Sequence, residues 1–306
     1  MLDEIQIPGS TPEQDEKIVS ALDGALSALA TLAGTRTVEV DLPILKVKAY
    51  VKPVNGSEEL RLRTMKASGA AFIKSFNKVI FEHVNFEGIK FDDFEDFQNN
   101  LSPADKNILV YALLDSTFTK LPEKIITCPS CGQVDTHNPE PSKIFHSDSI
   151  SKVWEHEEES SEYMVKSTIV DGFDVMYAMP SETDRLLVIE SKENSELRDE
   201  LEETDDILSP IELFSVYIKQ INIKQGDTLF ELTDKVKEIL PLLKDMPMEL
   251  KSKLLSDETV SEFIDYNPKF YLNITCSNIA CKQKEFKWDN INPEQDFFLK
   301  ALSVYN

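Results

Sequence analysis

Alternating apolar and polar residues open the regular part of the chain. Residues 38–42 (VEVDL) and 45–51 (LKVKAYV) place apolar side chains at every second position, which is the pattern of half-buried strands. Pro43 and the segment 53–56 (PVNG) interrupt this alternation. The pattern predicts two short strands joined by a tight turn.

Helical spacing follows. Residues 64–84 carry large apolar side chains on one helical face. Ser102 is followed by a proline and, three positions on, by an aspartate, which predicts the start of a helix that includes residues 108–118. Residues 17–33 also have apolar side chains every three or four positions, and we expect a helix that docks on a partner or on the rest of the chain, or one that forms only on docking. The alternative for the whole arm of residues 1–35 is a disordered, solubilising tail.

The middle of the chain has a mixed pattern. Residues 163–179 contain strand-like apolar runs, and Ser181 is placed to cap a further helix. Residues 193–206 are so highly charged that we expect a solvated helix end or a connector. Residues 211–266 predict several short helical pieces, and residues 294–302 a last helix.

Four cysteines occur in two pairs of similar context. Cys128 and Cys131 form a C-P-S-C-G motif, and Cys276 and Cys281 form C-S-N-I-A-C. Each pair follows a strand-like segment that ends Ile-Thr-Cys, and we expect two hairpins, each presenting two thiolates. Because zinc prefers a tetrahedral shell of four thiolates, the pattern predicts one structural zinc ion per chain, held as in a split zinc ribbon. Such a site closes its coordination shell, which excludes a catalytic role for the metal.

Other interpretations of the cysteines remain open. The hairpins can keep their shape without an ion, and His137 or His146 can replace a cysteine as ligand. A redox pair is favoured by a strand-to-helix context, whereas strands flank this motif. A structural disulfide is disfavoured in a reducing cytoplasm. No residue pattern specifies an enzyme, and we interpret the protein as non-catalytic.

The charge is uneven. The formal net charge is −23, from 55 acidic and 32 basic residues. Residues 153–206 carry 18 acidic and 4 basic residues, whereas residues 36–90 carry 10 basic and 6 acidic. The overall balance argues against a protein that binds nucleic acid by neutralising phosphates. One local basic and aromatic patch lies in the second hairpin, which we interpret mainly as hairpin surface and core aromatics: Lys282, Lys284, Phe286, Lys287 and Trp288.

The chain contains no apolar run near the ~18 residues that a membrane helix needs. Its N-terminal residues 1–17 are acidic and contain Pro8 and Pro12, unlike a secretion signal. We therefore expect a protein that is made and used in a cytoplasm, with no membrane partner.

Four short motifs, in this order, carry a family resemblance: Tyr111-Ala112-Leu113-Leu114, Cys128-Pro129-Ser130-Cys131-Gly132, Met179-Pro180-Ser181-Glu182 and Asp296-Phe297-Phe298. Over about residues 38–302 the chain resembles the T-even-type phage baseplate hub and tail-assembly family. The second cysteine pair departs from the family pattern in its wider spacing, and residues 1–35 have no counterpart in it.

The resemblance implies a non-enzymatic viral protein, either a component of the baseplate hub or a chaperone for its assembly. Its partners would be baseplate hub or tape-measure proteins, and it would act in the host cytoplasm during assembly or in the virion baseplate. Association of the chain with further copies of itself, as a homo-oligomer, is a second possibility. The alternative function is a zinc-ribbon module that binds nucleic acid.

The resulting fold class is α+β, with an N-terminal β segment and helices, a split pair of zinc-ribbon-like cysteine hairpins, and a helical insert between them. The predicted parts are an acidic N-terminal arm with a short helix (1–35), an α/β region with the first cysteine hairpin (36–152), an acidic, mainly helical insert (153–268), and the second cysteine hairpin with a C-terminal helix (269–306).

Overall fold

The computed structural model describes residues 36–56, 58, 69–146, 166–170, 172–194, 208–256 and 267–303. The chain separates into two units, residues 1–37 and residues 38–306, and every element below belongs to the second unit. The predicted helix at 17–33 and nearly all of the charged connector at 193–206 lie outside the described residues. The described part is a mixed α+β structure, as the sequence predicts.

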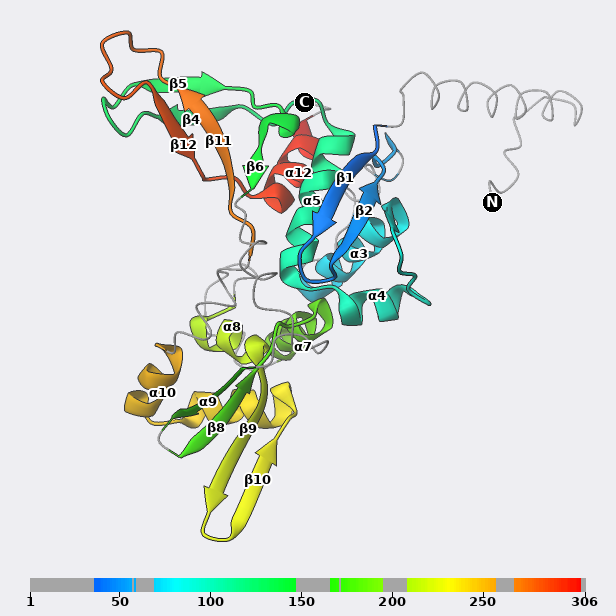
Figure 1. Cartoon of the computed structure of the whole chain (residues 1–306), viewed down its shortest axis with the longest axis vertical. Helices are drawn as coiled ribbons and strands as arrows, with labels where there is room; N and C mark the ends of the chain where they lie inside the picture. The colour runs from blue at the N-terminus through cyan, green and yellow to red at the C-terminus, as the bar shows by residue number, and fades with distance from the viewer. Residues whose placement is uncertain are drawn as a thin grey trace, which may run out of the picture. The chain divides into compact units, whose positions relative to one another are not determined.

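The elements before residue 153 and after residue 268 form what we call the body, and an antiparallel sheet is its first layer (Figure 1). Val40 and Leu42 are buried on its first strand, and Ala49 and Val51 on its second, because alternate residues of a strand face opposite sides. The predicted pair of strands is therefore confirmed. In their order of pairing the strands are β1 (Val38–Leu42), β2 (Val47–Val51) and β3 (Val84–Phe86).

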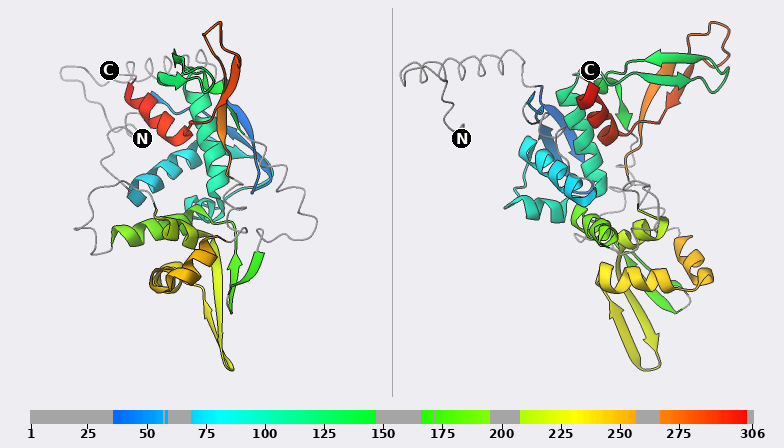
Figure 2. Two further views of the ribbon diagram at one scale, coloured as in Figure 1. Left: turned by 90° about the vertical axis from the view of Figure 1, so that its left-hand side faces the viewer. Right: turned by 180° about the vertical axis from the view of Figure 1, so that it is seen from behind.

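Three helices complete this body: α3 (Gly69–His83), α4 (Phe94–Asn100) and α5 (Pro103–Thr117). The predicted start of α5 is confirmed, since the Ser102 hydroxyl accepts a hydrogen bond from the backbone N–H of Asp105 at 3.0 Å. Helix α5 is buried on nearly all sides. It packs against β1, β2 and α3, and against α12 (Pro293–Ser303) from the other end of the chain, which lies beside it in both views of Figure 2.

A buried carboxylate fixes the turn between β1 and β2. The backbone N–H groups of Ile44 and Leu45 both donate to Asp105, each at 3.0 Å. Burial raises the pKa of the Asp105 carboxyl to about 7, although these hydrogen bonds and the one to Ser102 act in the opposite direction. The carboxylate joins the first residues of α5 to a turn about 60 positions earlier in the sequence.

The described part of the insert contains a four-stranded antiparallel sheet: in order of pairing, β10 (Thr228–Leu232), β9 (Ile218–Gln225), β8 (Phe173–Tyr177) and β7 (Lys166–Val170). The prediction of helices throughout 211–266 is wrong at residues 218–232, where β9 and β10 form a hairpin. Gly226 has a φ of +62° in the two-residue turn, a conformation that glycine adopts without strain. The signals for a hairpin were the alternation of Ile221 and Ile223 with polar residues and the Gly226-Asp227 turn that follows them.

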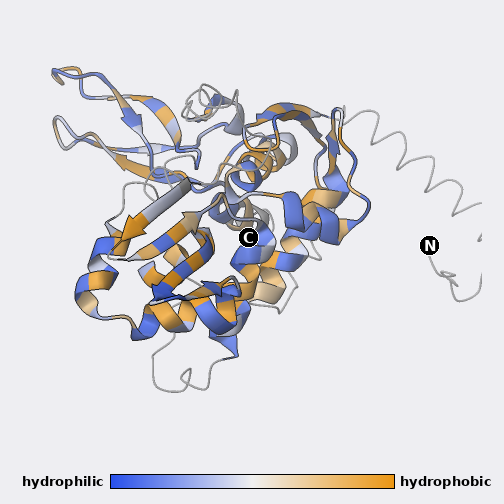
Figure 3. Ribbon diagram, turned by 60° about the horizontal axis from the view of Figure 1, so that its bottom comes forward, coloured by the Kyte–Doolittle hydropathy of each residue, from blue (hydrophilic) through white to orange (hydrophobic). Residues whose placement is uncertain are grey.

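Helices cover one face of this sheet: α7 (Glu182–Glu193), α8 (Pro210–Tyr217), the π-helical turn η3 (Lys235–Ile239), α9 (Leu240–Asp245) and α10 (Met248–Leu255). The predicted cap of α7 is confirmed, because Ser181 and Asp184 exchange hydrogen bonds as a capping box. A second hydrophobic core, which includes Val175, Tyr177 and Ile221, lies between the sheet and the helices. Hydrophobic and hydrophilic residues alternate along the elements, as expected where one face is buried (Figure 3).

A buried ion pair joins α5 to α7. The Lys106 ammonium donates to Glu182 at 3.0 Å, and the side-chain amide of Asn77 donates to the same oxygen at 3.1 Å. Burial by itself raises the pKa of Glu182, but the charges of Lys106 and Arg185 outweigh it and hold the pKa below its usual value. Removing one partner of such a pair leaves an uncompensated buried charge, so the pair fixes how the insert docks on the body.

Two hairpins carry the cysteines. The first consists of β4 (Lys124–Thr127) and β5 (Val134–His137), and the second of β11 (Phe270–Thr275) and β12 (Glu285–Trp288). Strand β11 also pairs with β6 (Phe145–His146), which follows the 3-10 turn η1 (Pro141–Lys143). Both predicted strand–turn–strand units are confirmed. No helix in the described ranges is long and apolar enough to cross a membrane.

The raised pKa of Asp105 predicts a pH dependence of stability. The folded protein holds the Asp105 proton between its ordinary pKa of 3.8 and about 7, where the unfolded chain has lost it. The stability that this proton contributes is therefore complete below pH 3.8 and declines as the pH rises to about 7.

Asp105→Asn does not ionise and should remove this decline, which amounts to about 2–3 kcal/mol between about pH 5 and about pH 8. Urea unfolding followed by circular dichroism at both pH values measures it. The quantity to compare between wild type and variant is the change in the free energy of unfolding with pH. The free energy at a single pH is not informative, because asparagine also alters the hydrogen bonds to Ile44 and Leu45 at every pH. Identical slopes in the two proteins would contradict the prediction.

Candidate metal centre

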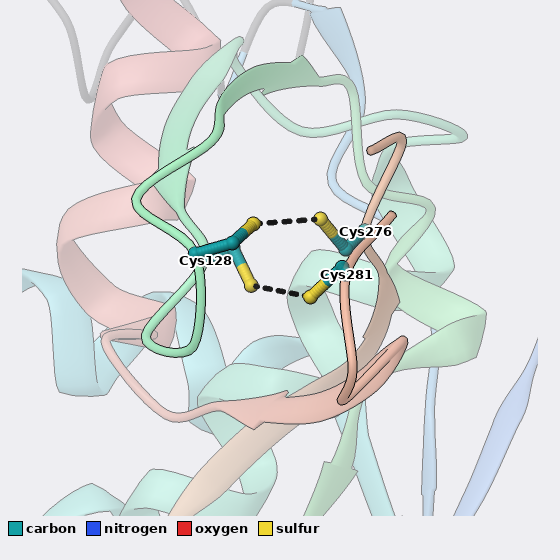
Figure 4. Close-up of side chains that lie close together, drawn as sticks. Cys128, Cys276 and Cys281 are labelled. Carbon is teal, nitrogen blue, oxygen red and sulfur yellow. Dashed lines mark hydrogen bonds between the residues drawn. The ribbon is translucent and has the colours of Figure 1, made fainter. Parts of the chain in front are cut away.

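Four cysteine sulfur atoms from the two hairpins converge. The ligand atoms of Cys128, Cys131, Cys276 and Cys281 all lie within 4.8 Å of one another. Two pairs run between the hairpins, with 3.8 Å between the sulfurs of Cys128 and Cys281 and 3.6 Å between those of Cys131 and Cys276. Figure 4 shows Cys276 and Cys281 facing Cys128 across the junction. All four are free thiols.

The first turn is shaped by its backbone hydrogen bonds. The N–H of Gly132 donates to the carbonyl of Cys128 at 2.9 Å, and the N–H of Cys128 donates to the carbonyl of Gln133 at 2.8 Å. Gly132 has a φ of +73°, which side chains with a Cβ atom rarely tolerate. The glycine lets the chain reverse directly after the second cysteine, so that both thiols point to the same side.

The second turn accommodates its two additional residues. The N–H of Cys276 donates to the carbonyl of Lys284 at 2.7 Å, and the N–H of Cys281 donates to that of Asn278 at 3.0 Å. The side chain of Asn278 accepts a further bond from the N–H of Ala280 at 3.0 Å. The extra residues bulge outward, leaving Ile279 88% exposed, and the C-x₄-C spacing still brings both sulfurs into the cluster.

A direct contact between the hairpins reinforces the junction. Asp135 on β5 accepts hydrogen bonds from the hydroxyl of Ser277 at 2.6 Å and from its backbone N–H at 3.2 Å. The Ser277 hydroxyl, together with Gln133, holds the pKa of Asp135 below its usual value. The sequence does not predict this pair, because its members are 142 positions apart and the C-S-N-I-A-C motif that contains Ser277 does not indicate a partner for it.

The thiols differ in acidity and burial. The backbone N–H of Gln133 lowers the pKa of Cys131 to about 7, whereas burial raises the pKa of Cys276 to about 12. Cys131 is exposed and the other three are buried. Four thiolates this close repel one another, so a bound cation is the natural way to ionise all of them.

Neither histidine that the sequence left open as a ligand belongs to the cluster. His146 lies edge-on to the rings of Tyr111 and Phe270, with centroids 6.3 and 6.1 Å away. His137 lies at the end of β5, opposite Lys124. Elsewhere, His83 contacts Glu58 at 3.0 Å. His156 and Glu157 to Glu159 lie outside the described residues.

The basic and aromatic patch of the second hairpin divides between two faces. Phe286 and Trp288 are half-buried against the main hydrophobic core, which lies around α5 and includes Ile80 and Leu109. Lys287 lies on the opposite face of β12, with its ammonium 4.4 Å from the ring centre of Tyr271. Lys282 and Lys284 are exposed. The lysines therefore lie on the hairpin surface, and the two aromatic side chains pack on the core. Phe286 and Trp288 do not share a face of β12 with Lys287.

A cavity of about 510 Å³ lies where the insert meets the body, and no cysteine lines it. Ser102, Ser181 and Lys235 are among the residues that line this cavity. The Lys235 ammonium donates to the carbonyls of Val216 and Ile218 at 2.8 and 2.6 Å. Lys235 therefore links η3 to the junction of α8 and β9 within the insert.

Comparison of the chain with protein-family models finds no matching model, and comparisons with curated proteins and with solved structures find no match either. What the site can do is therefore inferred from its geometry and chemistry.

Proposed function

We propose that the four cysteines hold one structural zinc ion, and that the protein is a non-enzymatic component or assembly chaperone of a phage baseplate hub. The convergence of four thiols within 4.8 Å carries the metal part of this proposal. The family resemblance of residues 38–302 is the basis of the biological part.

The sulfur geometry matches the proposed ion. With Zn–S bonds of ~2.3 Å, a regular tetrahedron has edges of ~3.8 Å. The sulfurs of Cys131 and Cys276 are 3.6 Å apart and those of Cys128 and Cys281 are 3.8 Å apart. Small adjustments of the remaining pairs, which lie within 4.8 Å, complete the tetrahedron.

The ligand set favours a structural role. Four thiolates fill the coordination shell and leave no position for water or substrate, which a catalytic zinc needs. Two hairpins facing each other across such an ion would form a zinc-ribbon arrangement that is split across the sequence. The ion would tie together two segments separated by residues 132–275, so its binding energy would become folding energy.

The motifs behind the resemblance lie at packing positions. Leu113 and Leu114 belong to the buried helix α5, Glu182 to the buried ion pair, and Phe297 to the main core. Residues of this kind specify a fold, and this supports a protein that acts through its surfaces. Acidic residues 153–206 would present a partner of basic charge with a complementary surface.

Metal content tests the site. Purified protein should contain about one zinc per chain by elemental analysis, and removing it should lower the free energy of unfolding by about 4 kcal/mol when free zinc is ~1,000 times Kd. The paired substitution Cys128→Ser and Cys131→Ser should abolish zinc binding. Ser130→Ala, in the same turn but with no thiol, is the matched control and should keep the metal. Freshly reduced wild-type protein without zinc would refute the site.

Partner capture tests the biological role. Tagged protein expressed in cells that contain the hub and tape-measure proteins should co-purify with at least one of them, and the interaction should weaken with rising salt because the insert is acidic. Mass spectrometry of finished virions then separates a permanent component from a chaperone. Recovery without these partners, combined with useful affinity for DNA that falls steeply with salt, would favour the nucleic-acid alternative.

A further inference from the structure

Strand β10 forms an open edge of the insert's sheet. Within the described residues it pairs only with β9, and the β9–β10 hairpin extends beyond the helices that cover the sheet (Figure 1). An open edge presents a row of backbone N–H and C=O groups that can pair with another strand.

The apolar face of the sheet continues to this edge. Val170, Phe173, Ile223 and Phe230 lie side by side on the four strands, as the registers show. The next row toward the helices contains Val175 and Ile221, which are fully buried, whereas Phe230 is 46% exposed. The row therefore ends at a large aromatic side chain that the described part of the chain leaves half uncovered.

The edge has little of the usual protection against pairing. Natural edge strands are short, or carry charged residues (lysine above all), proline or a bulge. Strand β10 (TLFEL) has no lysine or proline and pairs with β9 without a register shift, and its protection is limited to its length of five residues and one charge, Glu231. A strand of this kind is suited to an interface.

Local charge suggests which partner fits. Residues 218–235 contain three lysines and three acidic residues, a net charge of zero, in a chain whose net charge is −23. Two copies of such an acidic chain repel each other over most of their surfaces. The hairpin is a neutral region where a second copy can approach.

We propose that β10 pairs antiparallel with β10 of a second copy of this chain, about a two-fold axis at Phe230. This register places Thr228 opposite Leu232 and Leu229 opposite Glu231, and it places Phe230 opposite its own counterpart. No like charges stand directly opposite each other, although the two Glu231 side chains are diagonal neighbours ~7–8 Å apart. The two four-stranded sheets become one continuous sheet, and the two Phe230 rings cover each other at its centre.

Sedimentation velocity across a concentration series tests the dimer in the full chain. Phe230→Lys places two ammonium groups opposite each other and should raise the dimer dissociation constant at least tenfold. Leu229→Lys, on the same strand, places a lysine opposite Glu231 and should preserve or tighten the dimer. Met248→Lys, at a 73% exposed site on α10, is the control for lost apolar surface and should have no effect.

Crosslinking tests the register. Facing residues of an antiparallel pair are close enough for a disulfide, whereas residues offset by two positions are ~7–8 Å apart, too far for one. Phe230→Cys should therefore form a covalent dimer through residue 230 under mild oxidation, identified by peptide mass spectrometry, and Leu229→Cys should not.

Three results would overturn the proposal: a monomeric wild-type protein at every concentration, a dimer that Phe230→Lys leaves unchanged, or a β10 edge that pairs only with a strand of a different protein. The zinc site is distant in sequence from β10, so a metal-free protein that still dimerises would reject the zinc proposal alone.

Discussion

The convergence of four sulfurs on one point is the constraint on which the rest of the second unit depends. Cys128 and Cys131 must meet Cys276 and Cys281 although residues 132–275 lie between the two pairs. Closing a loop of that length costs about 4 kcal/mol of chain entropy. The Asp135–Ser277 contact is exposed and contributes little to offsetting that cost. The pairing of β6 with β11 and the burial of Phe270 and Phe297 beside α5 already join the two ends of this loop. A metal held by the four thiolates would add its binding energy to these contacts and would keep the two hairpins together around the insert.

Two further contacts position the parts around this junction. Asp105 fastens the β1–β2 turn to the first residues of α5, and the Lys106–Glu182 pair beside it fastens α5 to the first residues of α7. Adjacent residues of one helix thus hold the N-terminal sheet and the insert. Helix α5 also packs against α12, which follows the second cysteine hairpin, so the central helix joins elements from both ends of the second unit. Removing one member of either contact would leave a buried polar group without its partner, so both contacts constrain how these parts pack.

Local patterns predicted much of this structure. Alternation gave β1 and β2, capping residues gave the first turns of α5 and α7, and the repeated Ile-Thr-Cys endings gave both hairpins and the four cysteines of the site. The β9–β10 hairpin was not predicted, because the three-residue spacing of Ile218 and Ile221 resembles that of the neighbouring helices and only Ile221 and Ile223 alternate as in a strand. Asp105, Glu182 and Asp135 were not predicted to have their roles, because each depends on a partner 60 or more positions away. Whether the ion is zinc, and which partner the protein serves, are proposals from chemistry and resemblance.

X-ray absorption spectroscopy at the zinc edge tests the central claim most directly, because it reports the atoms bonded to the metal in purified wild-type protein. We predict four sulfur neighbours at ~2.3 Å and no nitrogen or oxygen in the first coordination shell. A shell that contains nitrogen or oxygen ligands, or reduced protein that takes up no zinc, would contradict the account.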